Sequence, residues 1–432
     1  MKNILYTIEL FFITVAGCQA VSQGHKAVTQ QMQEYPVAIQ AFYPVIKMDS
    51  DQISDVVKKY FEKRLVHGNF NGGVIVAKGG SIIYEEYSGL KDLRKDELLD
   101  ARSPLHIASV SKTITSAAIL KLAQDGKLRL GEPISDFFPV FPYSDVTVCM
   151  LLSHRSGIPN YVHYLEALGW DRNVYATNQD VVNSLYNLHP QPEFKAGTRF
   201  SYSNTNFLLL AMIIEKLTGM SYPVYMKTNF FDPLQMNDTH VFTLADTATA
   251  IPSYEWNGRV WGWDFLDGTY GDKNIYTTPR DLLKFSLVLS GGNFIRQSLL
   301  DSAYMPYSNE RPGIHNYGLG WRLMMLKNGK KIIYHNGRWH GSNASFVRLP
   351  DEDVTIIIIG NRFDRNIYTV ARNSSDLFGD YINGGSLNDD EENGIALKRS
   401  YKRPVAKKSH HRKHNTASRS SRKTIVKNGG GK

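Results

Sequence analysis

Cysteine is nearly absent from this chain of 432 residues, which contains only Cys18 and Cys149. Two cysteines cannot build a disulfide framework, and if Cys18 is modified or removed no disulfide is possible at all. Cys149 is then predicted to be a small core residue. The cysteine and histidine spacings of zinc sites, the dinucleotide fingerprint G-x-G-x-x-G and the P-loop are also missing. We therefore expect neither a metal nor an organic cofactor.

Acidic residues are missing from one end of the chain. Residues 396–432 carry thirteen of the 50 Lys and Arg residues and none of the 41 Asp and Glu residues. The formal net charge of +9 therefore belongs to this end, and the rest of the chain is slightly acidic. The charge gives no reason to expect a nucleic acid partner. Residues 383–432 are predicted to be a disordered basic tail, either a solvated extension or a contact for an anionic lipid or cell-wall polymer.

Long hydrophobic runs are scarce, and the one candidate lies at the N-terminus. Lys2 is followed by an apolar segment, which Glu9 interrupts, and by Val15-Ala16-Gly17-Cys18. This pattern resembles a bacterial secretory signal that ends in a lipobox, so residues 1–18 are predicted to be a signal segment with Cys18 as the lipidation site. An ordinary signal peptide or a short membrane anchor is the alternative.

The predicted location follows from these segments. Residues 19–49 would be a spacer between the anchor and a domain over residues 50–382. No other stretch approaches the about 20 apolar residues of a spanning helix, so we expect this domain to be soluble. The sequence thus predicts a protein of the bacterial cell envelope, lipid-anchored or else periplasmic or secreted.

The most informative motif that the chain does contain is Ser109-Val110-Ser111-Lys112. A serine and a lysine at this spacing lie on one face of a helix, and a partly desolvated amine can take the proton of the hydroxyl. Only this match opens a long apolar segment of the kind that forms a buried helix. We therefore predict Ser109 as a nucleophile and Lys112 as its base. The same pattern occurs in two other places, at Ser88 with Lys91 and at Ser420 with Lys423.

A second motif, Tyr202-Ser203-Asn204, precedes an apolar helix predicted over 207–217. A loop in front of a buried helix can project Tyr202 into a cleft, where its phenol can relay a proton for the nucleophile. Asn204 can offer its amide to a substrate carbonyl and to Lys112. A lone tyrosine is otherwise a core aromatic, so the position of the motif, and not the pattern, carries this prediction.

A third motif, His335-Asn336-Gly337, is the only H-x-G in the chain and ends a strand predicted over 331–334. A residue that leaves an edge strand beside the nucleophile can supply a backbone N–H to an oxyanion hole, here that of Arg338 together with that of Ser109. Gly337 would let the substrate approach the backbone closely. His335 would orient the substrate and support Tyr202, although a histidine at a strand end is usually a surface or hydrogen-bonded residue.

The hydrophobic periodicity predicts an α+β fold. A helix over 50–66 and a hairpin over 72–87 come first, and strand patterns return at 320–325, 331–335, 345–349 and 354–360. The middle is rich in helices, at 146–154, 179–187, 203–219, 279–291 and 296–304, and a last helix is predicted over 366–381. We expect one antiparallel sheet built from both chain ends with flanking helices, plus a helical lobe inserted in the middle. The site would lie in the cleft between them.

The order of the three motifs resembles that of the serine hydrolases of the beta-lactamase and penicillin-binding-protein superfamily, in the branch of class C beta-lactamases, D-alanyl-D-alanine carboxypeptidases and family VIII esterases. The resemblance implies a beta-lactamase/transpeptidase-like fold, Ser109 as the acylated nucleophile, and Lys112 and Tyr202 as the proton-handling pair. It also implies that Asn204 contacts substrate and lysine. Further segments resemble family landmarks, namely 151–157, 196–198, 218–219, 278–282 and 317–321.

The third motif departs from the lactamase pattern. His335 stands where the lactamases have the lysine of K-T-G, similar to D-Ala carboxypeptidases and D-aminopeptidases of this branch, and Asn336 replaces a threonine that helps to hold a substrate carboxylate. Carboxylate recognition would then need Arg338 or Arg155. An alternative alignment uses Trp339-His340-Gly341 as the W-x-G of some esterases, and we favour His335.

The predicted function is therefore cleavage of an ester or amide, such as a D-Ala-type peptide or a small ester, through an acyl-enzyme. The substrate would be a small molecule or peptidoglycan-like. Two alternatives stay open: a beta-lactamase proper, or a non-catalytic receptor for muropeptides or penicillins.

Overall fold

The computed structural model describes residues 52–382. The predicted signal segment with Cys18, the spacer and the basic tail lie outside these residues, as do the first two residues of the predicted opening helix.

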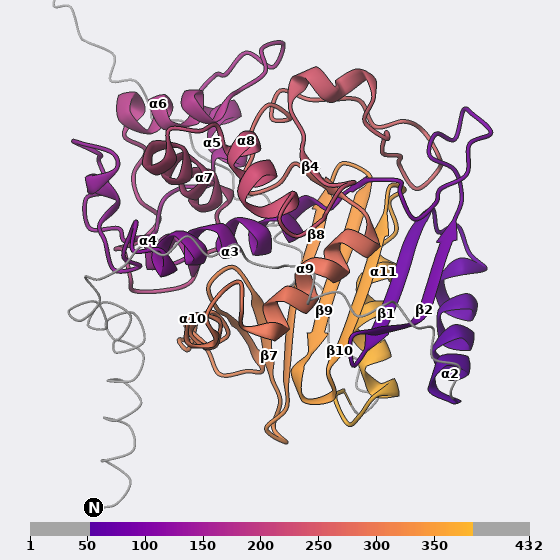
Figure 1. Cartoon of the computed structure of the whole chain (residues 1–432). Helices are drawn as coiled ribbons and strands as arrows, with labels where there is room; N and C mark the ends of the chain where they lie inside the picture. The colour runs from indigo at the N-terminus through magenta and orange to yellow at the C-terminus, as the bar shows by residue number, and fades with distance from the viewer. Residues whose placement is uncertain (1–51, 383–432) are drawn as a thin grey trace, which may run out of the picture. The chain divides into compact units, whose positions relative to one another are not determined.

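A seven-stranded antiparallel sheet joins both ends of the described chain (Figure 1). Its strand order is β2-β1-β10-β9-β8-β7-β6, so the N-terminal hairpin is paired to the last strand of the chain. This arrangement confirms the predicted α+β class and the sheet made from two chain ends. The strands are β1 (Gly72–Lys78), β2 (Ser81–Ser88), β6 (His315–Tyr317), β7 (Arg322–Met325), β8 (Lys331–Trp339), β9 (Ser342–Leu349) and β10 (Val354–Gly360).

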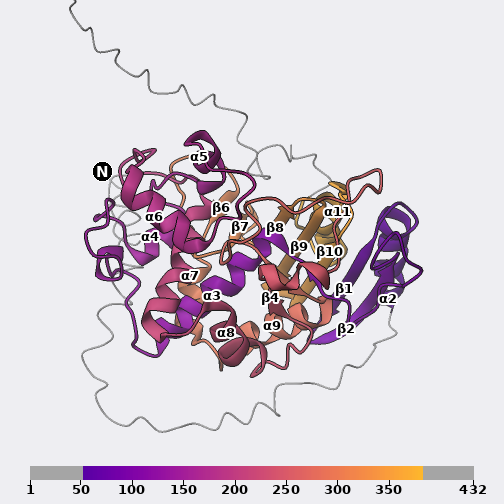
Figure 2. The same cartoon turned by 90° about the horizontal axis from the view of Figure 1, so that it is seen from above.

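Helices cover both faces of this sheet (Figure 2). Successive side chains of a strand point to opposite faces, so β10 contributes Ile357 to the core on one side and Ile356 to the core on the other. The first core includes α9 (Pro279–Gly291), and the second includes α2 (Gln52–Phe61) and α11 (Asn366–Asn373). Because both faces are covered, every residue of β10 is buried.

The middle of the chain forms the predicted helical region around α3 (Ser111–Gln124), which is buried along most of its length. Cys149 lies in the hydrophobic core there, as predicted, but it is disulfide-bonded and not a free thiol. A small sheet of order β3-β5-β4 stands beside it. The remaining elements are α4 (Val148–Leu152), α5 (Tyr161–Ala167), α6 (Asn178–Leu188), α7 (Asn204–Thr218), α8 (Tyr222–Met226), α10 (Gln297–Ala303), β3 (Leu105–His106), β4 (His240–Val241) and β5 (Ile275–Thr277).

Helix ends differ modestly from the predictions. The opening helix changes at Glu62 to a π-helical turn, and the last helix is shorter than predicted, since α11 ends at Asn373 and a 3-10 turn follows over Ser374–Leu377. Within residues 52–382 no single helix is long and apolar enough to cross a membrane. The bent pair Asn204–Thr218 and Tyr222–Phe231 passes that test jointly, by length and composition.

Candidate active site

The turn that carries Ser109 lies between β3 and the central helix. A 3-10 turn covers Ala108–Val110, and α3 begins only at Ser111, so Ser109 precedes the helix that the sequence predicted it to open. Its side chain is partly exposed, while the helix behind it is buried. Ala108 has a φ of 48°, in the left-handed region that costs a non-glycine residue about 1 kcal/mol or more. The turn thus holds the Ser109 hydroxyl at the accessible end of a buried helix.

Lys112 is fully buried, and its amine is surrounded by three oxygen acceptors. Nζ lies 3.1 Å from the Oγ of Ser109, 2.8 Å from the Oδ1 of Asn204 and 2.6 Å from the backbone oxygen of Asp272. An ammonium group has three N–H donors, one for each oxygen, whereas a neutral amine has two and a lone pair. The acceptors of Asn204 and Asp272 fix two N–H groups, so the lone pair of a neutral amine faces Ser109. This geometry suits a base for the serine hydroxyl.

Tyr202 lies in the loop in front of α7, where the sequence placed it. Its ring centroid is 5.0 Å from the Nζ of Lys112, and the side chain lines the same cavity as Ser109. The structure therefore brings Ser109, Lys112, Tyr202 and Asn204 together from two segments of the chain. Their roles in catalysis stay predictions.

His154 holds this loop in place, although none of the three motifs contains it. Its backbone oxygen accepts from the N–H of Ser201 at 2.9 Å, and its Nδ1 accepts from the N–H of Ser203 at 3.3 Å and from Nδ2 of Asn206 at 3.1 Å. The two backbone bonds lie on either side of Tyr202, and the imidazole and phenol ring centroids are 4.3 Å apart. Burial, and then the charge of Lys112, hold the pKa of His154 well below its usual value. We infer a neutral ring whose proton is on Nε2.

The strand of the third motif is longer than predicted. β8 continues to Trp339, and His335, Asn336 and Gly337 pair in register with Phe346, Ser345 and Ala344 of β9. The prediction that His335 ends the strand is therefore wrong. The predicted edge position is correct for this part of β8, because β7 pairs only with residues 331–334 and leaves residues 335–339 with β9 on one side. The strand predicted over 345–349 already contains the partners of His335 and Asn336, and only residues 342–344, which include the partner of Gly337, were not predicted.

His335 is buried inside the sheet and does not line the cavity that contains Ser109. Its Nδ1 lies 2.7 Å from the backbone oxygen of Asn336, and its Nε2 lies 3.2 Å from the Oη of Tyr317. Burial, then Arg322 and Lys112, lower its pKa well below the usual value. His335 is thus a neutral histidine with a hydrogen-bond partner on both ring nitrogens. Its ring centroid is 6.3 Å from that of Tyr202, so it contributes to the wall behind the phenol.

Gly337 brings β8 against the turn that holds Ser109. A Cβ atom at this position would lie 2.3 Å from the backbone oxygen of Ile107 and 3.0 Å from the backbone nitrogen of Ser109. The absence of a side chain at Gly337 therefore makes room for the protein's own backbone, and not for the substrate as predicted from the sequence. The cavity that contains Ser109 has a volume of about 150 Å³, and its lining includes Asn336, Gly337 and Arg338.

The arginines proposed for carboxylate recognition have different positions. Arg338 lines the cavity, and its guanidinium lies 4.4 Å from the ring centroid of Phe363. Arg155 is paired with Glu310 and donates to the backbone oxygens of Tyr307 and Gly197, and it is not among the residues that line the cavity. A third arginine, Arg322 of β7, lines the cavity and was not predicted.

The alternative motif Trp339-His340-Gly341 covers the end of β8 and the turn after it. Trp339 lines the cavity, but a Cβ atom at Gly341 would meet the backbone of Tyr254, far along the chain from the nucleophile. Gly337, and not Gly341, thus lies against Ser109.

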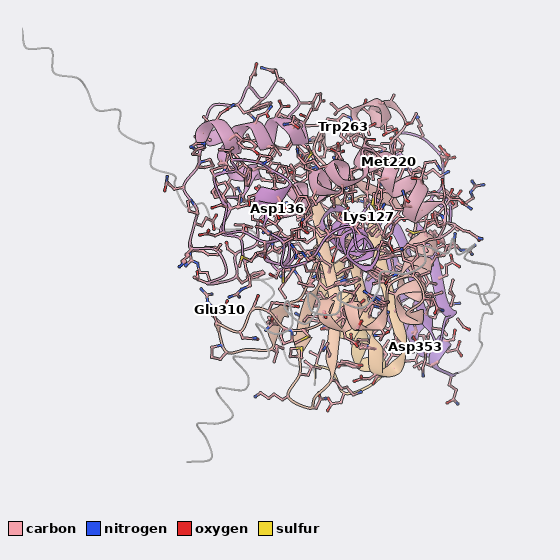
Figure 3. The ribbon with its side chains drawn as sticks, turned by 60° about the vertical axis from the view of Figure 1, so that its left-hand side comes forward. Lys127, Asp136, Met220, Trp263, Glu310 and Asp353 are labelled. Carbon is pink, nitrogen blue, oxygen red and sulfur yellow. The ribbon has the colours of Figure 1, made fainter. Side chains whose placement is uncertain are left out.

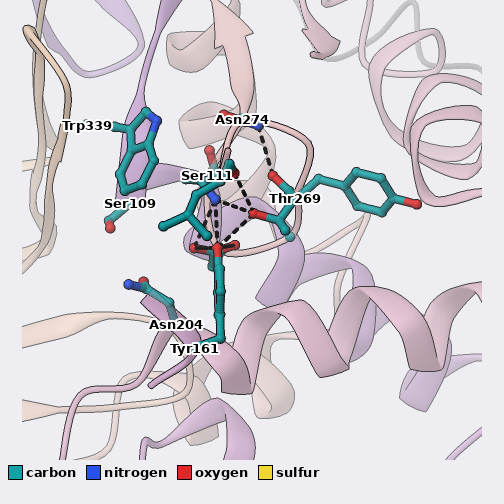
Figure 4. A network of polar contacts seen from close by, with 12 residues as sticks. Ser109, Ser111, Tyr161, Asn204, Thr269, Asn274 and Trp339 are labelled. Carbon is teal, nitrogen blue, oxygen red and sulfur yellow. Dashed lines mark hydrogen bonds and ion pairs between the residues drawn. The ribbon is translucent and has the colours of Figure 1, made fainter. Parts of the chain in front are cut away.

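A buried ion pair, Asp272 with Lys273, adjoins Lys112 and was not predicted. The Nζ of Lys273 lies 3.8 Å from the Oδ2 of Asp272 and donates to the Oη of Tyr161 at 2.6 Å and to Thr269. Burial lowers the pKa of Lys273. Figure 4 shows Tyr161 and Thr269 in this network, with the indole of Trp339 beside Ser109. Asp272 and Lys273 are adjacent in a polar loop, and such a pair has the same sequence pattern whether it is buried or exposed to solvent.

Asp264, Asp267 and His340 form one group of possible cation ligands, with donor atoms within 4.8 Å of one another. The carboxylate of Asp267 already accepts from Nε1 of Trp339 at 2.6 Å and lies 2.9 Å from the Nε2 of His340. We therefore describe this group as a hydrogen-bonded cluster and assign no metal to it.

Ser109 precedes a buried helix, Lys112 lies in the first turn of that helix, and the antiparallel sheet beside it is built from both ends of the described chain. This combination defines a beta-lactamase-like serine hydrolase. The family model described as Beta-lactamase matches residues 57–377. The chain therefore belongs to the beta-lactamase family.

Known proteins agree with this assignment. Penicillin-binding protein 4* of Bacillus subtilis (strain 168) is 32% identical over 319 residues, which are 70% of this chain and 70% of that protein. The octameric penicillin-binding protein homologue from Pyrococcus abyssi has a TM-score of 0.64 at 22% identity, over 76% of this chain and 77% of that one. The D-amino acid amidase from Ochrobactrum anthropi SV3 has a TM-score of 0.62 at 23% identity, over 76% of this chain and 97% of that one. These two structures share the fold.

Proposed function

We propose that this protein hydrolyses an amide or ester through an acyl-enzyme on Ser109. The observation that carries the proposal is the orientation of the Lys112 amine. Asn204 and the backbone oxygen of Asp272 accept two of its N–H groups, and its third tetrahedral position points to the hydroxyl of Ser109. A receptor that only binds its ligand has no need for this arrangement.

In the proposed reaction the neutral amine of Lys112 takes the proton of Ser109 as Oγ bonds to the substrate carbonyl carbon. The backbone N–H groups of Ser109 and Arg338 would stabilise the oxyanion, because Gly337 brings this part of β8 against the nucleophile. The carbon–nitrogen or carbon–oxygen bond then breaks, and the leaving group takes a proton passed through Tyr202. In the second half of the reaction, water attacks the acyl carbon and gives its proton to the same groups. The bond to the Oγ of Ser109 then breaks, and the acid is released.

For the substrate we propose a D-Ala-type peptide, a D-amino acid amide or a small ester above a beta-lactam. The printed names of the related proteins, a penicillin-binding protein and a D-amino acid amidase, support this choice. So does the neutral, buried His335 in place of a cation.

The test is covalent labelling with a fluorescent acylating probe, read by gel and by intact mass. We expect one serine-dependent adduct in the wild type and none in Ser109→Ala. Ser88→Ala is the matched control, because Ser88 also has a lysine three residues later, and it should label as the wild type does. Labelling of Ser109→Ala at the wild-type rate would refute the proposal.

Turnover separates the remaining alternatives. Nitrocefin, D-Ala-D-Ala peptides and p-nitrophenyl esters would be compared as substrates. A stable adduct with no turnover of any of them would favour a penicillin-binding receptor, and fast nitrocefin hydrolysis would favour a beta-lactamase.

We also propose attachment to the bacterial envelope through Cys18, with the basic tail as a contact for anionic polymer or lipid. Metabolic labelling with a fatty acid should mark the full chain and not Cys18→Ala. Equal labelling of both would overturn the anchor.

A further inference from the structure

A second and larger cavity adjoins the one that contains Ser109. It has a volume of about 500 Å³, within the range of small-molecule sites. We call it the outer cavity, and its lining includes Trp261, Trp263, Tyr276, His106 and His340. Trp339 lines both cavities, so the outer cavity continues from the catalytic one across this indole.

The aromatic walls of the outer cavity are held in place from behind. Trp263 stacks on the buried Phe242, with ring centroids 4.9 Å apart and 20° between the rings, and Trp261 lies 5.6 Å from the ring of His340. The two indoles are nevertheless 37% and 36% exposed, so each has one supported side and one accessible side. Figure 3 shows Trp263 at the surface, away from the turn that holds Asp353. Preorganised rings of this kind favour an aromatic ligand.

The polar groups of the outer cavity are paired with each other. His106 lies 3.0 Å from Oδ1 of Asn274, and burial lowers its pKa to about 4, so it is neutral at pH 7. The charge of Asp267 is met by Trp339 and His340. At the rim, two cations pair with carboxylates, Arg94 with Asp92 at 2.8 Å and Lys91 with Glu97 at 2.8 Å. Lys95 and Arg102 also line the cavity, and both are exposed, with Arg102 paired to Asp238 at 3.3 Å. Beside the indole of Trp339, where the charge of Asp267 is already compensated, an incoming charge would lose its hydration without a new partner.

We propose that the outer cavity binds the non-reacting end of the substrate and that it takes an uncharged group with an aromatic ring. The proposal rests on acylation at Ser109. Gly337 lies against Ser109, and Trp339 is two residues further along β8, which is about 7 Å of extended strand. An acyl chain that runs beside β8 therefore reaches the indole of Trp339 after about three methylene groups.

The kinetic test compares p-nitrophenyl 4-phenylbutyrate, which spans this distance, with p-nitrophenyl acetate, which does not. The ratio of their kcat/KM values should fall about fivefold to tenfold in Trp261→Ala and in Trp263→Ala, the size of an aromatic contact. Trp256→Ala is the matched control, because this tryptophan is on the same loop and 69% exposed but does not line the cavity. An unchanged ratio in both cavity variants would overturn the proposal, and so would an equal fall in the control.

A binding test separates this inference from the proposed function. Ser109→Ala protein would be titrated with 4-phenylbutyramide, which needs no acylation, and binding would be followed by tryptophan fluorescence and calorimetry. We expect binding that weakens about fivefold or more on adding Trp261→Ala, and that is weaker for 4-(4-carboxyphenyl)butyramide, whose carboxylate is on the ring that enters the outer cavity. Binding that ignores Trp261→Ala, or that favours the carboxylate, would overturn the inference even if Ser109 is acylated. Binding as expected would support it even if labelling of Ser109 fails.

Discussion

Two substitutions at His154 test whether a histidine outside the three motifs sets the position of Tyr202. His154→Asn keeps an acceptor where Nδ1 now lies and tolerates the left-handed backbone, with φ at 55°, because asparagine adopts this conformation more readily than most residues. His154→Leu keeps most of the side-chain volume and loses the acceptor. The two variants thus separate the hydrogen bonds from the packing.

The magnitudes follow from the contacts. Leucine leaves two buried donors without an acceptor, the N–H of Ser203 and Nδ2 of Asn206, at about 1 to 3 kcal/mol each. The left-handed backbone adds about 1 kcal/mol. We therefore expect His154→Leu to lower the free energy of unfolding by about 3 to 7 kcal/mol. Asparagine loses the ring contacts with Tyr202, Phe207 and Tyr317 and should cost about 1 to 3 kcal/mol.

Catalysis should depend on the acceptor and not on total stability. A displacement of a catalytic group by about 1 Å can cost 100-fold in rate, so we expect His154→Leu to lose at least tenfold in kcat and His154→Asn less than threefold. KM should change little in either, because His154 does not line the cavity. The assay is steady-state ester hydrolysis with urea denaturation of the same preparations. If His154→Asn lowers kcat as much as His154→Leu does, or if His154→Leu retains full kcat, the hydrogen bonds to His154 do not position Tyr202.

Three further predictions concern packing, charge and pH. Gly337→Ala should lower kcat at least tenfold, because the new Cβ would displace the nucleophile turn, whereas Gly131→Ala, at a glycine with nothing within 4 Å, should have no effect; equal activities of the two variants would contradict this. Lys273→Met should destabilise by about 3 kcal/mol because it leaves Asp272 buried without its cation, and a double-mutant cycle with Asp272→Asn should recover part of that loss; simple additivity would refute the coupling. Between pH 6 and pH 5 the free energy of unfolding should fall by about 1.2 kcal/mol for each histidine that burial keeps neutral in the fold, because only the unfolded chain takes up the proton. This stability should be regained as the pH rises above the ordinary pKa of 6.5. A flat profile in urea titrations would show that these side chains are protonated in the native state. The histidines are His106, His154 and His335.

Local patterns were sufficient to predict the sheet and its helices. Apolar residues typical of buried strands occur in Val354–Gly360 and in the hairpin of Gly72–Lys78 with Ser81–Ser88. The pairing of β1 with β10 joins the two ends of the described chain in one sheet. The strand of the third motif was cut short because Asn336 and Gly337 have low strand propensity. Its partner Ser342–Leu349 and the covering turn at Ser109 override that propensity, and neither can be deduced from the motif itself.

The candidate site was predictable where one helix or one loop sets the spacing, and unpredictable where distant segments meet. Ser109 and Lys112 are neighbours on one turn of chain, so their contact follows from their spacing. Lys273 and His154 enter the site from other elements, and a lysine or histidine in a polar loop has the same sequence signature whether it is buried or solvated. Only the fold shows that both are buried beside the amine of Lys112.

Strained backbone conformations around the cleft are held in place by contacts within the protein. Ala108, His154, Asn274 and His340 all have positive φ, between 48° and 70°, and each belongs to a segment that lines or supports one of the two cavities. Such conformations cost about 1 to 3 kcal/mol each and persist only where surrounding contacts determine them. Here those contacts are hydrogen bonds within the protein, at His154 to Ser203 and at Asn274 to the backbone of Asp267 and Thr269. These contacts fix the segments around Ser109, Lys112 and Tyr202 during folding, so that in the proposed reaction binding energy from the outer cavity would remain for lowering the acylation barrier.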